Sequence, residues 1–198
     1  MSKSSLSHSA VSESSPLQIS SPHLHELSIR AEQPQDQAAI QEVLIQAFLN
    51  HPHSQQTEHL IVQNLRQRQE LSIALVAVHQ QKILGFIAIS PVTLNGHTPK
   101  HETEHWYGLG PVAVHAEQQG HGIGSTLIRT ALNQLQLRFP AQGCVVLGEP
   151  EYYGRFGFKA HPHLTLEGVP TEYFQALVFA GTLPAASVSY SPAFAISA

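Results

Sequence analysis

Three glycines at alternate positions, in the segment QQGHGIGST, separate an apolar run from a helix-like run. The run before them, LGPVAV, contains valines that favour a strand, and LIRTALNQL after them has apolar residues at helical spacing. Glycine reaches positive φ and carries no Cβ, so the backbone of this turn is able to approach a ligand closely. At the start of a helix, open N–H groups and the helix dipole favour an anion, most often a phosphate. A tight turn that binds nothing is the alternative.

Two common phosphate loops fit this segment poorly. A nucleotide-hydrolase loop needs GxxxxGK[ST], but the last glycine here, Gly124, precedes Ser-Thr and no lysine. The dinucleotide pattern GxGxxG is nearer, because Gly120 and Gly122 match it and only Ser125 replaces the third glycine. Glu149, after the next expected strand, has the position of the ribose-binding acid of such sites. Against a dinucleotide site, the loop lies in mid-chain and no second run of strand–helix–strand units follows it.

The rest of the pattern predicts a mixed α/β domain around one sheet. Expected strands lie at 27–32, on both sides of a turn at Gln80–Gln81, at 106–114, at 143–148 and, last, at 172–179. The two runs around Gln80–Gln81 are apolar on both faces, which predicts central strands covered on each side. Gly110–Pro111 interrupts the fourth strand and indicates a bulge or a frayed edge, because proline donates no ladder hydrogen bond.

Helices are expected at 34–48, 55–69 and 122–137, with a short helix or turn within 149–158. The second helix is predicted to bury Leu60, Ile61 and Leu65. The third shows the clearest amphipathic stripe, formed by Ile123, Leu127, Ile128, Ala131, Leu132 and Leu135.

The amino-acid composition indicates which cellular compartment and which classes of binding partner to expect for this protein. The 198 residues, 42 % of them hydrophobic and 12 % charged, suit one globular domain with a substantial core. A net charge of -4 with only 10 Lys and Arg disfavours a nucleic-acid-binding surface. The one cysteine, Cys144, excludes an intramolecular disulfide and a cysteine-based zinc cluster, which fits a reducing compartment.

The start of the chain is rich in serine. Residues 1–22 contain ten serines, no arginine and no apolar stretch like that of a signal peptide. No apolar run in the sequence approaches the roughly 18 residues that span a membrane. We interpret residues 1–24 as a disordered or loosely attached tail. We expect a cytoplasmic protein without membrane or nucleic-acid partners.

The segment VAVHAEQQGHGIGSTLIRTAL resembles the acetyl-CoA-binding core of the GNAT acyltransferases. Their motif [RQ]xxGx[GA] is matched by Gln119, Gly122 and Gly124. Upstream, GLGPVAV is similar to the family's bulged strand. Downstream, VVLGEPEYYGRFGF is similar to its closing strand, short helix and final Y…GF signature, most of all to a bacterial subgroup with LGxPxYYxRFGF. The strong resemblance covers about residues 106–159.

The resemblance implies a GNAT-like α/β fold, with a mixed sheet that splays between its fourth and fifth strands and helices on both faces. It implies one N-acetyltransferase domain at 25–184, followed by an extension of uncertain order at 185–198. Acetyl-CoA would be the cofactor, with its pantetheine arm in the opening and its pyrophosphate over the glycine loop. The implied binding residues are Val112, Ala113, Val114, Gln119, Gly120, His121, Gly122, Ile123, Gly124 and Ser125.

Acyl transfer to an amine requires a polarised thioester carbonyl, a neutral amine and a protonated leaving thiolate. The resemblance assigns the first task to backbone N–H groups freed by the bulge at 112–114. It assigns the third to Tyr153, which has the family's tyrosine position four residues before Gly157. Packing of Tyr152 and Tyr153 against the sheet is the alternative for both rings.

A dedicated base is harder to find. Some family members use a glutamate on the fourth strand, but the matching position here lies near Gly108, which has no side chain. His105, Glu104 and Glu102 stand just upstream, as direct or water-mediated bases or as solvated loop residues. Loss of the amine proton to bulk water requires no base at all.

The remaining chemistry-bearing residues fit structural or surface roles. Cys144 lies in an apolar strand and is expected to be a buried structural residue. Arg155 and Lys159 are candidates for contact with CoA or an anionic substrate, or for solvated positions. Three H-x-H pairs (His23 and His25, His51 and His53, His161 and His163) each offer two ligands, whereas a metal site needs three or four, so no metal is expected.

Two functions follow from these observations. The first is an N-acetyltransferase acting on a primary amine of a small molecule or a peptide; the second is a non-catalytic module that binds acyl-CoA. The acceptor stays open, although the acids Glu102 and Glu104 favour a cationic amine. The loop at 92–105 and the C-terminal strands are expected to shape the acceptor pocket. A homodimer is an assembly that such families often form.

Overall fold

The computed structural model describes residues 27–49, 51–52, 54–96 and 105–196. Its helices are η2 (Pro34–Asp36), α1 (Gln37–Phe48), α2 (Glu58–Gln67), η3 (Ala116–Gln118), α3 (Ile123–Arg138), α4 (Pro150–Gly154), η4 (Thr171–Tyr173) and η5 (Pro192–Phe194). Its strands are β1 (Ser28–Ala31), β2 (Ile73–His79), β3 (Lys82–Asn95), β4 (His105–Val114), β5 (Ala141–Leu147), β6 (Lys159–Ala160), β7 (Leu164–Leu166), β8 (Phe174–Val178) and β9 (Ala186–Ser189). Within these residues, no helix is both long and apolar enough to cross a membrane.

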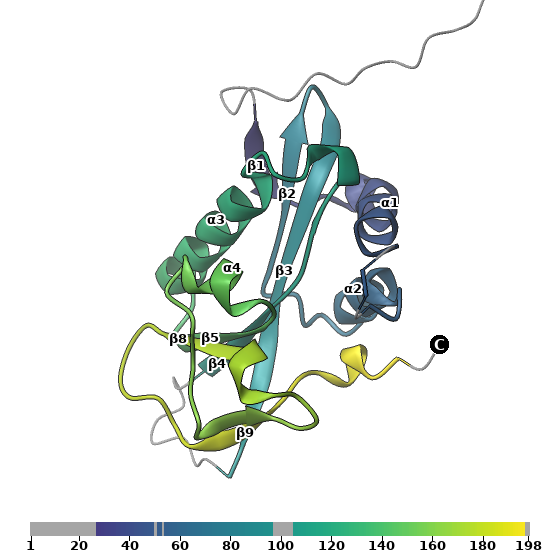
Figure 1. Cartoon of the computed structure of the whole chain (residues 1–198). Helices are drawn as coiled ribbons and strands as arrows, with labels where there is room; N and C mark the ends of the chain where they lie inside the picture. Colours follow the sequence, from purple (N-terminus) through teal and green to yellow (C-terminus); the bar gives the residue numbers. More distant parts are fainter. Residues whose placement is uncertain (1–26, 50, 53, 97–104, 197–198) are drawn as a thin grey trace, which may run out of the picture.

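One mixed sheet organises the molecule. Its strands run in the order β1-β2-β3-β4-β5-β8-β6, and β9 joins the far end of β3 and also pairs with β7 (Figure 1). The pairs β4–β5 and β7–β9 are parallel, and the other pairs are antiparallel. The predicted turn between the second and third strands is confirmed, since Gln80 and Gln81 both have positive φ, as a two-residue hairpin loop requires.

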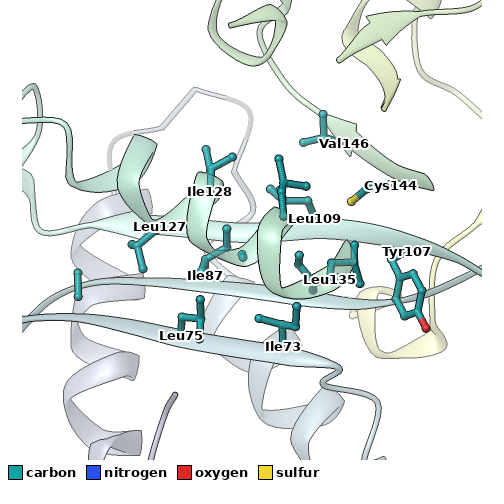
Figure 2. Close-up of a cluster of buried hydrophobic side chains, with 14 of the residues drawn as sticks. Ile73, Leu75, Ile87, Tyr107, Leu109, Leu127, Ile128, Leu135, Cys144 and Val146 are labelled. Atoms are coloured by element: carbon teal, nitrogen blue, oxygen red, sulfur yellow. The ribbon is translucent and has the colours of Figure 1, made fainter. Parts of the chain in front are cut away.

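Helices cover both faces of the sheet, as expected. α3 packs on one face, where Figure 2 shows Leu127 and Leu135 pointing toward the strands. α1 and α2 pack on the other face, around Phe86 of β3 (Figure 1). The predicted stripe of α3 is confirmed, because all six of its residues are buried: Ile123, Leu127, Ile128, Ala131, Leu132 and Leu135.

The predicted inner face of α2 is wrong in part. The buried residues are Val62 and Leu65, whereas Leu60 is 36 % exposed and Ile61 is half-buried. Successive residues of a helix point about 100° apart around its axis. Leu60 and Val62 therefore lie on different sides of α2, and the buried face is not the predicted one. Val62 packs with Val43 and Leu44 of α1 against the sheet, and this packing determines which side of α2 is buried.

The predicted bulge in the fourth strand is confirmed. In the β3–β4 ladder Ile87 pairs with Val112 and Ile89 with Leu109, so Gly110 and Pro111 together face a single residue of β3. The β4–β5 ladder ends at the pair Leu109 and Val146, although β4 continues to Val114 beside β3. Beyond the bulge, β4 therefore has an unpaired edge, which confirms the predicted opening between the fourth and fifth strands.

The strand expected at 172–179 is not the last one. β8 occupies Phe174–Val178, and β9 follows it, pairing Ser187 to Ser189 with Asn95 to Thr93 of β3. β9 alternates buried Ala186 and Val188 with exposed serines, and these polar residues hide the short apolar face in the sequence. Part of the segment 185–198, whose order the sequence left open, is therefore strand β9 and helix η5.

Candidate active site

The glycine loop leaves β4 at Val114 and enters α3 at Ile123. Gly120 and Gly122 have φ of 79° and 81°, in the left-handed region that favours glycine. A Cβ at either position would meet nothing within 4 Å, so the backbone conformation, not crowding, explains these glycines. Gly122 is the N-cap of α3, and within the described residues no side chain caps this helix end. The first N–H groups of α3 are therefore available to a ligand.

A cavity of about 440 Å³ opens at this loop, a volume within the range of small-molecule sites. It is lined by nine of the residues predicted from the sequence: Val112, Val114, Gln119, Gly120, Gly122, Ile123, Gly124, Ser125 and Tyr153. Two other predicted residues that the structure describes, Ala113 and His121, do not line it. The loop, the edge of β4 and α4 thus meet around one space.

The unpaired edge of β4 directs backbone groups into that space. His115 N–H donates to Leu84 O of β3 at 2.8 Å. Because successive residues of an antiparallel strand direct their backbone groups to opposite sides, Ala113 faces β3, whereas Val112 and Val114 face the opening. The carbonyl of Val114 accordingly accepts a hydrogen bond from Gln119 Nε2 at 3.2 Å, which ties the loop to β4. The side chain of Ala113 is buried on the α1 face.

Tyr153 reaches the cavity from α4, which begins directly after β5. Its ring lies on Gly148, where a Cβ would stand only 2.3 Å from Tyr153 Cε2. Phe158 packs edge-on against the same ring at a centroid distance of 6.1 Å. Burial, with a smaller contribution from Tyr152, raises the pKa of Tyr153 to about 12. The phenol is therefore protonated at neutral pH.

Three residues line the cavity although the sequence analysis did not assign them to the cofactor site: His51, Gln118 and Tyr152. Arg155, a candidate for contact with CoA, lines it as well. Gln118 is 2 % exposed, and its Oε1 has no hydrogen-bond partner among the described residues. No local pattern marks this glutamine, because its place follows from the turn η3. Arg155 stacks its guanidinium 4.4 Å over the Tyr152 ring, whose hydroxyl lies 3.0 Å from where a Gly124 Cβ would stand. Tyr152 therefore reaches the loop from α4.

The structure does not place His105, the one described candidate for a general base, at the cavity. His105 is exposed at the start of β4 and, although described, is not part of the lining. Glu102 and Glu104 lie outside the described residues. At Gly108 the space beside the backbone is occupied by the ring of Tyr190.

Other residues considered in the sequence also lie apart. Cys144 is fully buried, as expected, and burial raises the pKa of its thiol. Glu149 and Lys159 are exposed, and neither of these described residues lines the cavity. Across the described ranges, no group of three His, Cys, Asp or Glu residues converges on one point.

Comparisons with known proteins agree with this geometry. The family described as "Acetyltransferase (GNAT) domain" matches residues 70–160, which span β2 to β6. YhbS of Escherichia coli (strain K12), named as an uncharacterized N-acetyltransferase, is 32 % identical over 136 residues, 68 % of this chain and 75 % of YhbS.

Two crystal structures of relatives have a similar fold. A GNAT family acetyltransferase from Brucella melitensis, in complex with acetyl-CoA, is 43 % identical with a TM-score of 0.73, covering 86 % of this chain and 99 % of that one. YhbS from Escherichia coli, in complex with CoA, is 30 % identical with a TM-score of 0.73, covering 86 % and 93 %. By sequence and by fold, this chain belongs to the GNAT family of acetyltransferases.

Proposed function

We propose that this protein transfers the acetyl group of acetyl-CoA to a primary amine. The observation that carries the proposal is the meeting, in one cavity, of the open N-terminus of α3, the unpaired edge of β4 and the Tyr153 ring. The relatives from Brucella melitensis and Escherichia coli, in complex with acetyl-CoA and CoA, support acetyl-CoA as the donor.

The loop has the chemistry that a pyrophosphate requires. Its donors are the backbone N–H groups of residues 119–125, and the α3 dipole adds partial positive charge where they point. Gly120 and Gly122 keep the approach open, because a Cβ there would face empty space that a ligand is free to use. His121 contributes only its backbone to this proposal, since its side chain lies outside the lining.

Two further groups suit the amide-bearing arm of CoA. The Gln118 Oε1, buried and without a partner among the described residues, is an acceptor for an amide N–H. The N–H groups of Val112 and Val114 face the opening and are donors for the arm or for the thioester carbonyl. Ala113 supports them through its pairing with Phe86 of β3.

Acetyl-CoA supplies the thioester; the amine nitrogen forms the new C–N bond as the C–S bond breaks. Tyr153 donates its hydroxyl proton to the departing sulfur and regains a proton from the acylated nitrogen, so that no net proton is consumed. A thiol near pKa 8.5 is a stronger acid than this phenol. The return of the nitrogen proton to Tyr153 is therefore what completes the transfer. The ammonium form of the substrate loses its proton to bulk water before attack, so no base from the protein is required.

Thermal unfolding with acetyl-CoA, CoA, NAD and ATP at matched concentrations tests the donor. A ligand at about 100 times its Kd adds about 2.7 kcal/mol to the free energy of unfolding, a shift of several degrees in Tm. We expect a shift with acetyl-CoA and CoA alone, followed by thiol release on adding an amine from a panel. A shift with NAD alone contradicts the proposal. Binding of CoA without turnover on any amine favours a non-catalytic acyl-CoA module.

A further inference from the structure

Tyr190 fills the place on β4 where a side chain is missing. A Cβ built on Gly108 would stand 2.4 Å from Tyr190 Cε1 and 3.1 Å from Cδ1. No side chain fits between them, so the ring lies directly on the backbone of β4. Gly108 pairs with Val145 of β5, one step before the β4–β5 ladder ends. The ring therefore lies at the edge of the opening between the two strands.

The two tyrosines flank this opening from different segments. Tyr153 lies on Gly148, just beyond the end of β5, and Tyr190 lies on Gly108 of β4. Tyr107 and Leu109 point to the α3 face, so the alternation of the strand puts Gly108 and Tyr190 on the other face. Tyr153 packs against the cluster on the α3 face, so an acceptor beside Tyr190 would approach Tyr153 from the opposite face of the sheet.

Tyr190 is held firmly on both sides. Before it, Ser189 pairs with Thr93 of β3, and its hydroxyl accepts a hydrogen bond from Asn95 Nδ2 at 2.7 Å. After it, the Ser191 hydroxyl donates to the carboxylate of Glu70. The ring itself packs against Phe194 at a centroid distance of 4.8 Å. A side chain fixed in this way is suited to orienting a reacting group.

Two hydroxyls at this position have unused hydrogen-bonding capacity. Within the described residues, the Tyr190 hydroxyl has no hydrogen-bond partner. Ser90, which pairs with Gly108 and shares its face, is fully buried, and its Oγ also has no partner there. Burial raises the pKa of Tyr190, with smaller contributions from Cys144 and Tyr153. Tyr190 thus stays protonated and cannot serve as a base.

We propose that Tyr190 is an acceptor-binding residue, whose hydroxyl accepts a hydrogen bond from the N–H of the attacking primary amine. The aromatic rings of Tyr190 and Phe194 beside it favour an amine carried on an apolar or aromatic body. This inference rests on the proposed acetyl transfer. It deepens that function by naming the side of the sheet from which the acceptor comes.

Tyr190→Phe tests the inference, because it keeps the ring on Gly108 and removes only the hydroxyl. The readouts are kcat and KM for 2-phenylethylamine, KM for acetyl-CoA, and the Tm shift with acetyl-CoA. We expect kcat/KM for the amine to fall about tenfold, the scale of one lost hydrogen bond, with a higher amine KM. The acetyl-CoA KM and the Tm shift should not change. Tyr173→Phe is the matched control, since Tyr173 is 38 % exposed on η4 and, although described, is not part of the cavity lining.

Gly108→Ala provides a second, independent variant. The new methyl group would overlap the Tyr190 ring and displace it, so the same loss in amine kcat/KM is expected with acetyl-CoA binding retained. Amine kinetics of Tyr190→Phe within twofold of wild type, or a loss confined to acetyl-CoA, would overturn the role of Tyr190 alone. A wild-type protein that binds acetyl-CoA but acetylates neither 2-phenylethylamine nor any amine of the panel would overturn the proposed function as well.

Discussion

Three tyrosine side chains, two of which line the cavity, occupy space that glycines leave open. Tyr153 lies on Gly148, and Tyr190 lies on Gly108 at 2.4 Å from the place of a Cβ. Tyr152 reaches over Gly124 in the same way, with its hydroxyl 3.0 Å from that place. At the scale of single residues, the site is therefore shaped by side chains that are absent as well as by those that are present.

Tyr153→Phe is expected to lower kcat about 100-fold or more, because proton donation by a positioned side chain typically contributes that much. The ring packing against Phe158 is kept, so the Tm shift with acetyl-CoA should stay the same. Steady-state thiol release and thermal unfolding provide the two measurements. Equal turnover of the variant and the wild type would remove Tyr153 from the mechanism.

Gly122→Ala should weaken the loop through its backbone. A left-handed conformation costs a residue with a Cβ roughly 1–2 kcal/mol, and φ at this N-cap is 81°. We expect a lower urea midpoint and a smaller Tm shift with CoA. Gly154→Ala is the matched control, since its Cβ would meet no atom within 4 Å and its φ lies outside the left-handed region. A Gly122→Ala variant as stable as this control would contradict the strain argument.

The sequence predicted those residues of the site that lie close together along the chain. Gln119, Gly122 and Tyr153 belong to local motifs, and all three line the cavity. Tyr190 lies 82 positions after Gly108, and no spacing rule relates two residues whose contact depends on the folded sheet. Gln118 escaped prediction for a related reason, because its buried Oε1 follows from the turn η3 and not from its neighbours in sequence.

At the scale of elements, the C-terminal strand is fixed at its end by one serine. The Ser191 hydroxyl donates to Glu70 and also accepts from the N–H of Ala193 at 3.0 Å, as the N-cap of η5. The hydrogen bond from Ser191 is the main cause that lowers the pKa of Glu70. One side chain thus joins η5 to Glu70, in the segment between α2 and β2.

Ser191→Ala should remove both hydrogen bonds and destabilise the segment by about 1–2 kcal/mol, as the loss of a cap does. Hydrogen exchange of the amides in β9 and η5 should become faster, and the urea midpoint should fall. Ser187→Ala is the control, because Ser187 is an exposed residue of the same strand. Unchanged exchange in Ser191→Ala would show that pairing with β3 alone holds this segment.

The elements themselves were largely predictable, and their errors have physical causes. Long periodic segments such as α3 determine their own inner face. α2 is shorter and is oriented by its packing against α1 and the sheet, so its inner face was predicted only in part. β9 was missed because a serine-rich strand acquires its apolar face only through pairing with β3 and β7.

At the scale of the whole molecule, three tyrosines and the cysteine have pKa values above the ordinary values of their side chains. Burial raises the pKa of Tyr153 to about 12, and it also raises the pKa of Tyr107, Tyr190 and Cys144. In the unfolded chain the phenols ionise near pH 10 and the thiol near 8.5. The unfolded state therefore loses these protons first, and stability falls as the pH rises from about 9 toward 12.

Urea unfolding at pH 8, 9.5 and 10.5 should therefore give progressively lower midpoints. Tyr153→Phe and Tyr190→Phe should each reduce this pH dependence, because each removes one group with a raised pKa. Midpoints that stay constant up to pH 10.5 would contradict the burial of these groups.

The pairing of β9 with the far end of β3 has a consequence for how the chain is able to diversify. The loop between β4 and α3 and the Tyr190 segment are separate stretches of sequence, and among the described residues none of 186–194 lines the cavity at the loop. Substitutions within residues 186–194 are therefore able to alter what approaches Tyr190 while the loop stays as it is. Under the proposed function, the part that would hold the activated acyl group and the short C-terminal segment that would face its recipient could therefore change independently.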